Sequence, residues 1–225
     1  MDFVQNFPFF SIILSMFSGT VSSVLPAKAA KWLNTVVIGA VGCMSAVLLV
    51  YLMGKGTSYT YMMGHFPAPW GNEIRAGVLE AGMALFFCII MLLSLMGGRK
   101  KLLGEVEYSK HNLYYILTDL LLSSLLALVY TNDLFTAYVF VEINTISACG
   151  LIMIRQNGRT IEAAVRYMIM SLLGSGLLLV GISMLYDMTG HLLMSNIKET
   201  VGEIVAQGEF RMPLVVTIGL ICVGL

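Results

Sequence analysis

Charged residues are scarce in this sequence of 225 residues. Asp, Glu, Lys and Arg make up 12% of it, about half of the roughly 25% that soluble domains carry, whereas 58% of the residues are hydrophobic. This composition excludes a water-soluble globule and a disordered chain. The 13 basic and 13 acidic residues cancel, so the sequence offers neither a basic surface for nucleic acid nor an acidic tail for a cationic partner.

Cysteine and histidine are too scattered to indicate a cofactor site. The cysteines lie far apart in apolar runs without a C-x-x-C pair, and we interpret them as packing residues, not as disulfides or metal ligands: Cys43, Cys88, Cys149 and Cys222. All three histidines fall in predicted connections, where they cannot pair inside the membrane to bind haem: His65, His111 and His191. No phosphate-binding loop or hydrolytic triad is recognisable. We therefore expect no cofactor, no metal and no chemistry in this chain.

Long apolar runs recur along the sequence. A bilayer core about 30 Å thick requires roughly 20 apolar residues of helix. Six runs have that length: Phe7–Leu25, Trp32–Leu52, Ile74–Met96, Tyr114–Tyr130, Leu134–Ile154 and Ile161–Tyr186. A seventh run retains only Pro213–Leu225, about 20 Å of helix, so we expect the sequence to be a fragment of a longer subunit. The predicted class is an all-α integral membrane protein, a multi-span helix bundle with six complete transmembrane helices and a truncated seventh.

The basic residues are distributed unevenly between the two sides of the predicted bundle. Nine belong to the first, third and fifth connections or the helix edges beside them: Lys28, Lys31, Arg99, Lys100, Lys101, Lys110, Arg155, Arg159 and Arg166. Four lie on the opposite side: Lys55, Arg75, Lys198 and Arg211. The positive-inside rule predicts a multi-pass protein of the cell membrane with its N-terminus outside the cytoplasm.

Two connections contain structure of their own. Residues 57–72 alternate polar and large side chains and then become rich in Gly and Pro, which predicts a small external hairpin. Residues 196–205 place Ile197, Val201 and Ile204 on one helical face, which predicts a short helix in the membrane interface. The spacing of the residues at positions 196 and 199 is that of a capping box formed by Asn196 and Glu199.

Four ionisable residues lie inside predicted spans. They are Glu80, Asp119, Glu142 and Arg166. Each charge costs on the order of 2.5 to 3.5 kcal/mol on insertion scales, so each requires an explanation. Glu142 is the deepest, roughly 12 Å from either end of its span. Tyr138, Glu142, Thr145 and Cys149 recur at spacings of four, three and four, and their shared face could support a file of water.

Each of these ionisable residues has a functional and a structural interpretation. Burial favours the protonated form of a carboxyl, which would let Glu142 load and release a proton, but a protonated Glu142 could also only bond a neighbouring helix. Asp119 and Arg166 lie at matching depths, so they could form a salt bridge or contribute to a proton path. Glu80, roughly two turns from the outer end, could face a wet vestibule or pair with Arg75.

The sixth span contains small residues with small-xxx-small spacing. They are Ser171, Gly174, Ser175, Gly176 and Gly181. This spacing most often indicates close helix packing, so we expect a packing role and no chemistry for these positions.

Four stretches of the sequence resemble one family. Thr131–Glu142 is similar to the T-x-D-L-F-x-x-Y-V-F-x-E run of antiporter-like membrane subunits, which occur in Mrp-type Na⁺/H⁺ antiporters, respiratory complex I and energy-converting hydrogenases. Glu162–Tyr167 resembles the family's E-A-A-x-K-Y helix start, and Thr189–Met194 resembles its following turn. Pro67–Gly71 resembles the external hairpin before the third helix, whereas the first two spans match only in hydropathy.

The resemblance implies a subunit of about fourteen helices with two inverted five-helix repeats and a buried relay of carboxylate, lysine and polar residues. Residues 1–112 would form helices 1–3 with the hairpin, and residues 113–225 an incomplete first repeat. Glu142 occupies the position of the glutamate that pairs with a lysine of the broken seventh helix, and that lysine is expected beyond Leu225. Arg166 stands where the family often has lysine, and because Arg stays protonated it is unsuited to proton release.

We therefore predict a proton-conducting subunit, translocating H⁺ or exchanging Na⁺ for H⁺, in an Mrp-type antiporter or a related complex I-like or hydrogenase pump. Its partners would be other membrane subunits, which would carry any redox chemistry, and the lipid bilayer. The predicted pathway comprises Glu142 as proton-loading site together with Tyr138, Thr145, Asp119, Arg166 and Glu80. The alternative is a structural or assembly subunit whose buried charges only pair helices. A carrier of small solutes is a third interpretation, but no substrate-coordinating set is discernible.

Overall fold

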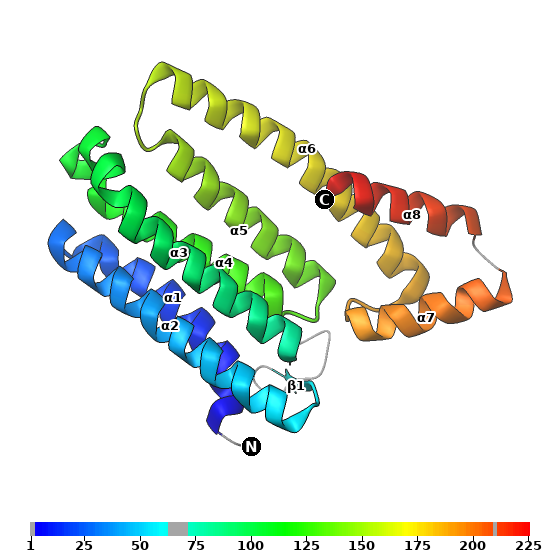
Figure 1. Ribbon diagram of the computed structural model, residues 1–225. Coiled ribbons are helices and arrows are strands. Elements are labelled where there is room, and N and C mark those ends of the chain that lie inside the picture. The colour runs from blue at the N-terminus through cyan, green and yellow to red at the C-terminus, as the bar shows by residue number, and fades with distance from the viewer. Residues whose placement is uncertain (1–2, 63–71, 209–210) are drawn as a thin grey trace.

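The apolar runs of the sequence fold into long helices joined by short connections (Figure 1). A computed structural model describes residues 3–62, 72–208 and 211–225. The helices in chain order are α1 (Phe7–Val24), α2 (Ala27–Lys55), α3 (Val78–Glu105), α4 (His111–Tyr130), α5 (Leu134–Met153), α6 (Gly158–Thr189), α7 (Met194–Gln207) and α8 (Arg211–Gly224). The shorter elements are the 3₁₀ helices η1 (Phe3–Asn6) and η3 (Tyr108–Lys110) and the strands β1 (Tyr59–Met62) and β2 (Glu73–Ala76).

The predicted class is confirmed: within the described ranges, six helices are long and apolar enough to cross a membrane, namely α1 to α6. The protein is a multi-pass, all-α membrane protein. Several helices are longer than their predicted apolar cores. The longest are α2, with 29 residues, and α6, with 32, about 43 and 48 Å at 1.5 Å per residue. Polar residues at their ends continue the helix past the apolar run.

The third span begins later than its hydropathy suggested. Ile74 does not start the helix, because it lies in β2, which pairs antiparallel with β1 in a register that sets Tyr59 opposite Ala76. Strand pairing satisfies the backbone groups of this apolar stretch, and α3 begins only at Val78. A hairpin is present, but only its first strand lies in the predicted range of residues 57–72, since the second strand occupies residues 73–76. The Gly- and Pro-rich residues 64–71 lie outside the described ranges.

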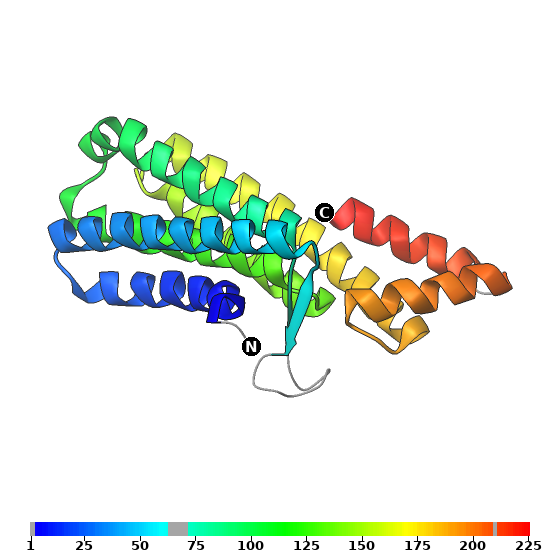
Figure 2. The ribbon, with the colours of Figure 1, turned by 60° about the horizontal axis from the view of Figure 1, so that its bottom comes forward.

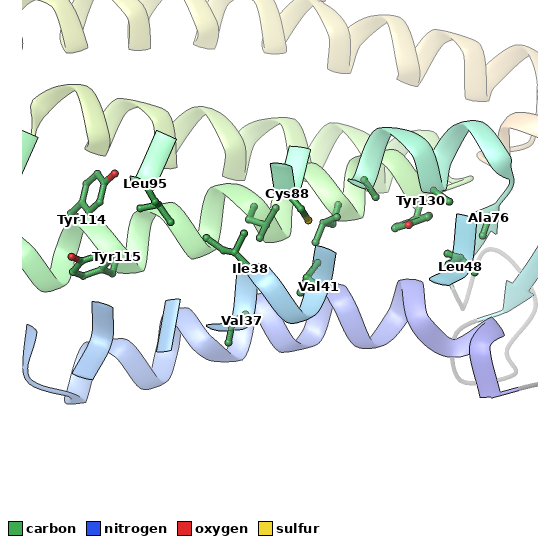
Figure 3. Close-up of a cluster of buried hydrophobic side chains, with 14 of the residues drawn as sticks. Val37, Ile38, Val41, Leu48, Ala76, Cys88, Leu95, Tyr114, Tyr115 and Tyr130 are labelled. Atoms are coloured by element: carbon green, nitrogen blue, oxygen red, sulfur yellow. The ribbon is translucent and has the colours of Figure 1, made fainter. Parts of the chain in front are cut away.

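The first four helices form a bundle around one apolar core. α1 packs on α2 and α4, and α2 packs on α3. Fully buried Ile38 and Val41 of α2 meet Cys88 of α3, while Tyr115 and Tyr130 lie toward opposite ends of the cluster (Figure 3). The packing role predicted for the cysteines fits Cys88 and Cys149, which are buried, but Cys43 and Cys222 are exposed.

A second layer of helices covers one side of this bundle. α5 packs between α4 and α6, and α8 packs on α6 (Figures 1 and 2). The α6–α8 contact is close because glycines line it: a Cβ built on Gly174 would lie 3.0 Å from the carbonyl oxygen of Gly224. Gly181 is likewise packed against Ile221, whereas Gly176 meets no atom within 4 Å. The small residues of α6 therefore serve packing at some positions only.

The short helix predicted for residues 196–205 is present as α7. Its predicted apolar face, Ile197, Val201 and Ile204, is partly buried, and the helix has no fully buried residue. The predicted capping box of Asn196 and Glu199 is wrong, since α7 begins at Met194. The amide of Met194 donates to the carbonyl of Asn132 at 2.8 Å, and this contact with the α4–α5 connection sets an earlier start.

Candidate functional site

The connections divide the molecule into two ends (Figure 1). The α1–α2, α3–α4 and α5–α6 connections, residues 25–26, 106–110 and 154–157, form what we call the basic end. The β1–β2 hairpin and the connections at residues 131–133 and 190–193 form the hairpin end.

Glu142 lies in the middle of α5, about 12 Å from the start of the helix and about 16 Å from its end. Asp133 fixes that start, because its Oδ1 accepts from the amide of Thr136 at 2.6 Å. The Glu142 side chain is partly buried, and the hydroxyl of Tyr138, one turn earlier, interacts with its carboxyl. In the described ranges no ion pair involves Glu142. The helix thus holds a carboxyl in mid-span beside one neutral hydroxyl.

The polar face predicted around Glu142 ends against α6. Thr145 is partly buried, but Cys149 is buried, and its thiol donates to the carbonyl of Ala164 in α6 at 3.2 Å. A cavity of about 330 Å³ between α4, α5 and α6 lies beyond this point, and its lining is mainly apolar. The polar portion of the face is therefore the segment from Tyr138 to Thr145.

Asp119 lies apart from the polar face of Glu142, in the interior of the bundle between α1, α2 and α4. Its side chain is 0% exposed and is held between three helices: Ser18 of α1 donates to Oδ2 at 2.8 Å, and Asn34 of α2 donates to Oδ1 at 2.7 Å. Gly19 lies beside this site, where a Cβ would be in ordinary van der Waals contact with the Cβ of Asp119, 3.4 Å away. Sequence reasoning missed both partners, although Asn34 is an isolated amide in an apolar run.

The predicted salt bridge between Asp119 and Arg166 does not form. Arg166 instead pairs with Glu162 one turn earlier on α6, at 2.5 Å, and the two side chains are 78% and 61% exposed. The depths of Asp119 and Arg166 match, but α5 packs between α4 and α6, and Asp119 points toward α1 and α2. Equal depth did not imply facing side chains.

Glu80 belongs to the first turn of α3 at the hairpin end. Its side chain folds back over Gly77, where a Cβ would lie 2.6 Å from Oε2. A carboxylate at a helix N-terminus is favoured by the helix dipole. The alternative pairing with Arg75 is absent from the residues that the structure covers. The six predicted pathway residues are thus not one cluster: only Tyr138, Glu142 and Thr145 share a face.

A polar cluster at the hairpin end was not predicted; it consists of buried Glu73 and Asn132 and exposed Ser195, and we call it the polar junction. The Asn132 amide nitrogen donates to Oε1 of Glu73 at 3.0 Å and to the hydroxyl of Ser195 at 3.2 Å. Its backbone amide also donates to the Glu73 carbonyl at 2.9 Å. Asn132 is 3% exposed and Glu73 8%. The junction joins the hairpin, the α4–α5 connection and the start of α7.

The α6–α7 turn completes this junction. α6 ends at Thr189, and Gly190 follows with a φ of 70°, a left-handed conformation that glycine adopts without strain. The chain then pairs with the α4–α5 connection, where the amide of Leu134 donates to the carbonyl of Leu192 at 2.9 Å. The motif starting at Thr131 and the turn starting at Thr189, far apart in sequence, therefore lie side by side.

Replacing Asn132 with leucine is expected to destabilise the protein by about 3 kcal/mol. Leucine keeps the branched shape of asparagine but leaves the buried Glu73 carboxyl without its side-chain donor, and a buried group that loses its partner costs about 1–3 kcal/mol, more when charged. The midpoint of thermal unfolding in detergent measures the effect.

The double variant Glu73→Leu with Asn132→Leu provides the control, because replacing both partners with apolar groups can be nearly neutral. It should be more stable than Asn132→Leu alone. A double variant whose loss equals the sum of the two single losses would show that the side chains do not interact energetically.

Comparison with known proteins gives one family for the C-terminal part of the chain. A sequence profile of the family described as "NADH:quinone oxidoreductase/Mrp antiporter, TM" matches residues 131–225. NADH-quinone oxidoreductase subunit N of Desulforudis audaxviator (strain MP104C) is 29% identical over 195 residues, covering 85% of this chain and 38% of the relative. A Na(+)/H(+) antiporter subunit of Bacillus subtilis (strain 168) is 27% identical over 160 residues, covering 71% of this chain and 32% of the relative.

The solved structures agree on the fold. A chain of the Mrp complex from Dietzia sp. DQ12-45-1b superposes with a TM-score of 0.80 at 18% identity, over 100% of this chain and 40% of the other. The chain spans less than two fifths of the length of the two curated relatives named above. The shared fold includes α1 and α2, for which the sequence offered only hydropathy.

Proposed function

Because the chain is a member of the antiporter-like family of membrane subunits shared by NADH:quinone oxidoreductases and Mrp antiporters, we propose that it moves protons, alone or in exchange for sodium, within a multisubunit membrane complex. The observation that carries the proposal is the Glu142 carboxyl, held in the middle of a transmembrane helix beside the Tyr138 hydroxyl. An ionisable group at this depth is expensive to bury and is therefore expected to have a function.

Glu142 is the proton-loading residue in this proposal. As a carboxylate it can accept a hydrogen bond from the neighbouring Tyr138 hydroxyl, and as an acid it donates its own proton along the polar face toward Thr145. A cationic side chain brought near the carboxylate favours the charged form, and its withdrawal favours proton uptake. Separation of that pair would couple a movement in the complex to the loading of one proton.

The other membrane subunits of the complex are the proposed partners, and any redox reaction takes place in them. The distribution of basic residues, nine toward the basic end and four toward the other, supports an orientation with the basic end in the cytoplasm and the N-terminus outside. Arg166 is exposed beside Glu162 on α6, and Glu80 lies at the start of α3. Neither residue shares a helix face with Glu142. They are peripheral to the proposed route.

A structural role is the second candidate, and the environment of Asp119 favours it. This carboxyl joins α1, α2 and α4 through neutral donors and resembles a helix-pairing group. A subunit of this kind would be needed for assembly of the complex but would carry no ions itself.

Reconstitution of the assembled complex into liposomes tests the proposal. A proton-sensitive dye inside the vesicles should report a pH change when the driving reaction or a sodium gradient is supplied, and a protonophore should abolish it. Sodium dependence separates proton movement alone from exchange. A complex that assembles with the chain but moves neither ion would support the assembly role instead.

A further inference from the structure

Among the described residues, the environment of Asp119 contains no charge to balance a carboxylate. α1 has no ionisable residue, and the lysines of α2, at positions 28, 31 and 55, are exposed at its two ends. On α4, the ionisable side chain one turn away is Tyr115, which is neutral at ordinary pH. In this part of the chain, Ser18 and Asn34 are the side chains that act on the carboxyl. An uncompensated charge at 0% exposure is costly, so a neutral, protonated form must also be accessible.

Both partners of Asp119 can serve either protonation state. The Ser18 hydroxyl donates to the carboxylate but can accept from the acid by rotating its proton. Asn34 donates through its nitrogen to Oδ1, and after rotation of the amide it would present its oxygen to the protonated carboxyl instead. The site therefore retains its hydrogen bonds when the carboxyl gains a proton.

Unpartnered polar atoms extend from this site toward the basic end. Oδ1 of Asn34 and Oγ of Ser22 are buried without a protein partner among the described residues, and both residues are fully buried. Ser22 lies one turn beyond Ser18 on the same face of α1, about 6 Å along the helix. Oδ1 of Asn112, about 10 Å from Asp119 along α4, likewise has no protein partner within the described ranges. Asn112 bonds the carbonyl of Leu25 and so lies at the basic end.

Buried polar atoms of this kind are ordinarily satisfied by internal water. We propose that Asp119, Asn34 and Ser22 form a second proton-exchanging site, distinct from Glu142, that bound water connects to the basic end past Asn112. Its ligand is the hydrated proton: hydronium transfers a proton to the carboxylate to give the acid and water, and release reverses the step. No oxidation or co-reactant is involved. The inference goes beyond the proposed function, because it assigns proton exchange to the α1–α2–α4 bundle.

Infrared difference spectra of the purified membrane complex between mildly acidic and mildly alkaline pH test this site. Asp119→Asn should remove one band of a protonated carboxyl, and Glu142→Gln should leave that band in place. Asp119→Glu should shift the band, which identifies it should the asparagine variant fail to accumulate. A carboxyl band of Asp119 that does not change with pH, or the absence of any such band, would overturn the proposal.

The path to the site is tested by the rate at which this band shifts in heavy water. Ser22→Ala removes a hydroxyl that bonds no protein group in the described part of the chain, and it should slow the shift by about tenfold, on the order expected when a hydrogen bond to the relaying water is lost. The matched control is Ser23→Ala, which removes an exposed hydroxyl bonded to the Thr20 carbonyl and should change nothing. Equal rates in the two variants would exclude the route past Ser22. Loss of transport in Glu142→Gln with this band intact would keep the two sites separate.

Discussion

The substitution Glu142→Gln is expected to lower the rate of ion translocation by the complex at least about tenfold relative to the unchanged protein. Glutamine has the size of glutamate and can still accept a hydrogen bond from the Tyr138 hydroxyl, but it neither binds nor releases a proton at physiological pH. Because Glu142 forms no ion pair in the described part of the chain, assembly and thermal stability should not change. Dye-reported proton uptake into liposomes, normalised to the amount of assembled complex, measures the effect.

Glu162→Gln is the matched control. Glu162 is also a glutamate in a transmembrane helix, but it is exposed and bonded to Arg166. Its neutralisation should leave transport unchanged, since an exposed pair of this kind contributes only about 0–1 kcal/mol. Full transport by Glu142→Gln would remove this carboxyl from the mechanism and leave the assembly role as the better account.

Valine at position 181 is expected to separate α8 from α6. A Cβ on Gly181 would lie 2.6 Å from Cγ1 of Ile221, 3.1 Å from the Ile221 amide nitrogen and 3.3 Å from the Thr217 carbonyl oxygen. Since backbone atoms stand in the way, α8 must move as a unit, and overpacking of this kind costs about 1–3 kcal/mol or more. Hydrogen exchange should show faster exchange of the α8 amides than in the unchanged protein.

The same substitution at Gly176 provides the control. Gly176 lies on the same helix, is exposed and has no atom within 4 Å of a built Cβ. Any change in helix propensity is therefore common to both variants, and the difference between them isolates the contact with α8. Equal exchange of α8 in the two variants would contradict the close packing.

Hydropathy was sufficient for the spans, because a transmembrane helix has only to supply enough apolar length. It failed at Ile74, where an apolar residue belongs to a strand. A strand and a helix can both bury such a residue, and only pairing with Tyr59–Met62 decides between them. The start of α7 was likewise set by a contact with Asn132, which lies more than sixty residues earlier in the chain.

The site was only partly predictable for a related reason. Sequence gives the depth of a residue along its helix and the neighbours on its own face, so the placement of Tyr138 beside Glu142 followed from spacing. It does not give the rotation of one helix relative to another. Asp119 and Arg166 have equal depth, yet the Asp119 side chain points toward α1, whereas the Arg166 side chain is exposed on the surface of α6. Partners across helices therefore had to come from the structure.

The hydrogen bonds of the polar junction connect α7 to the β1–β2 hairpin. α7 has no buried residue, but its first amide is bonded to Asn132, whose own amide is bonded to Glu73 in β2. If a neighbouring subunit bound α7 and displaced it, these hydrogen bonds would transmit the displacement to the α4–α5 connection and the hairpin. Through the bond of Leu134 to Leu192, the displacement would also reach the first turn of α5, the helix that carries Glu142. A helix at the surface of the bundle is in this way connected to the start of α5, about two helix turns from the Glu142 carboxyl.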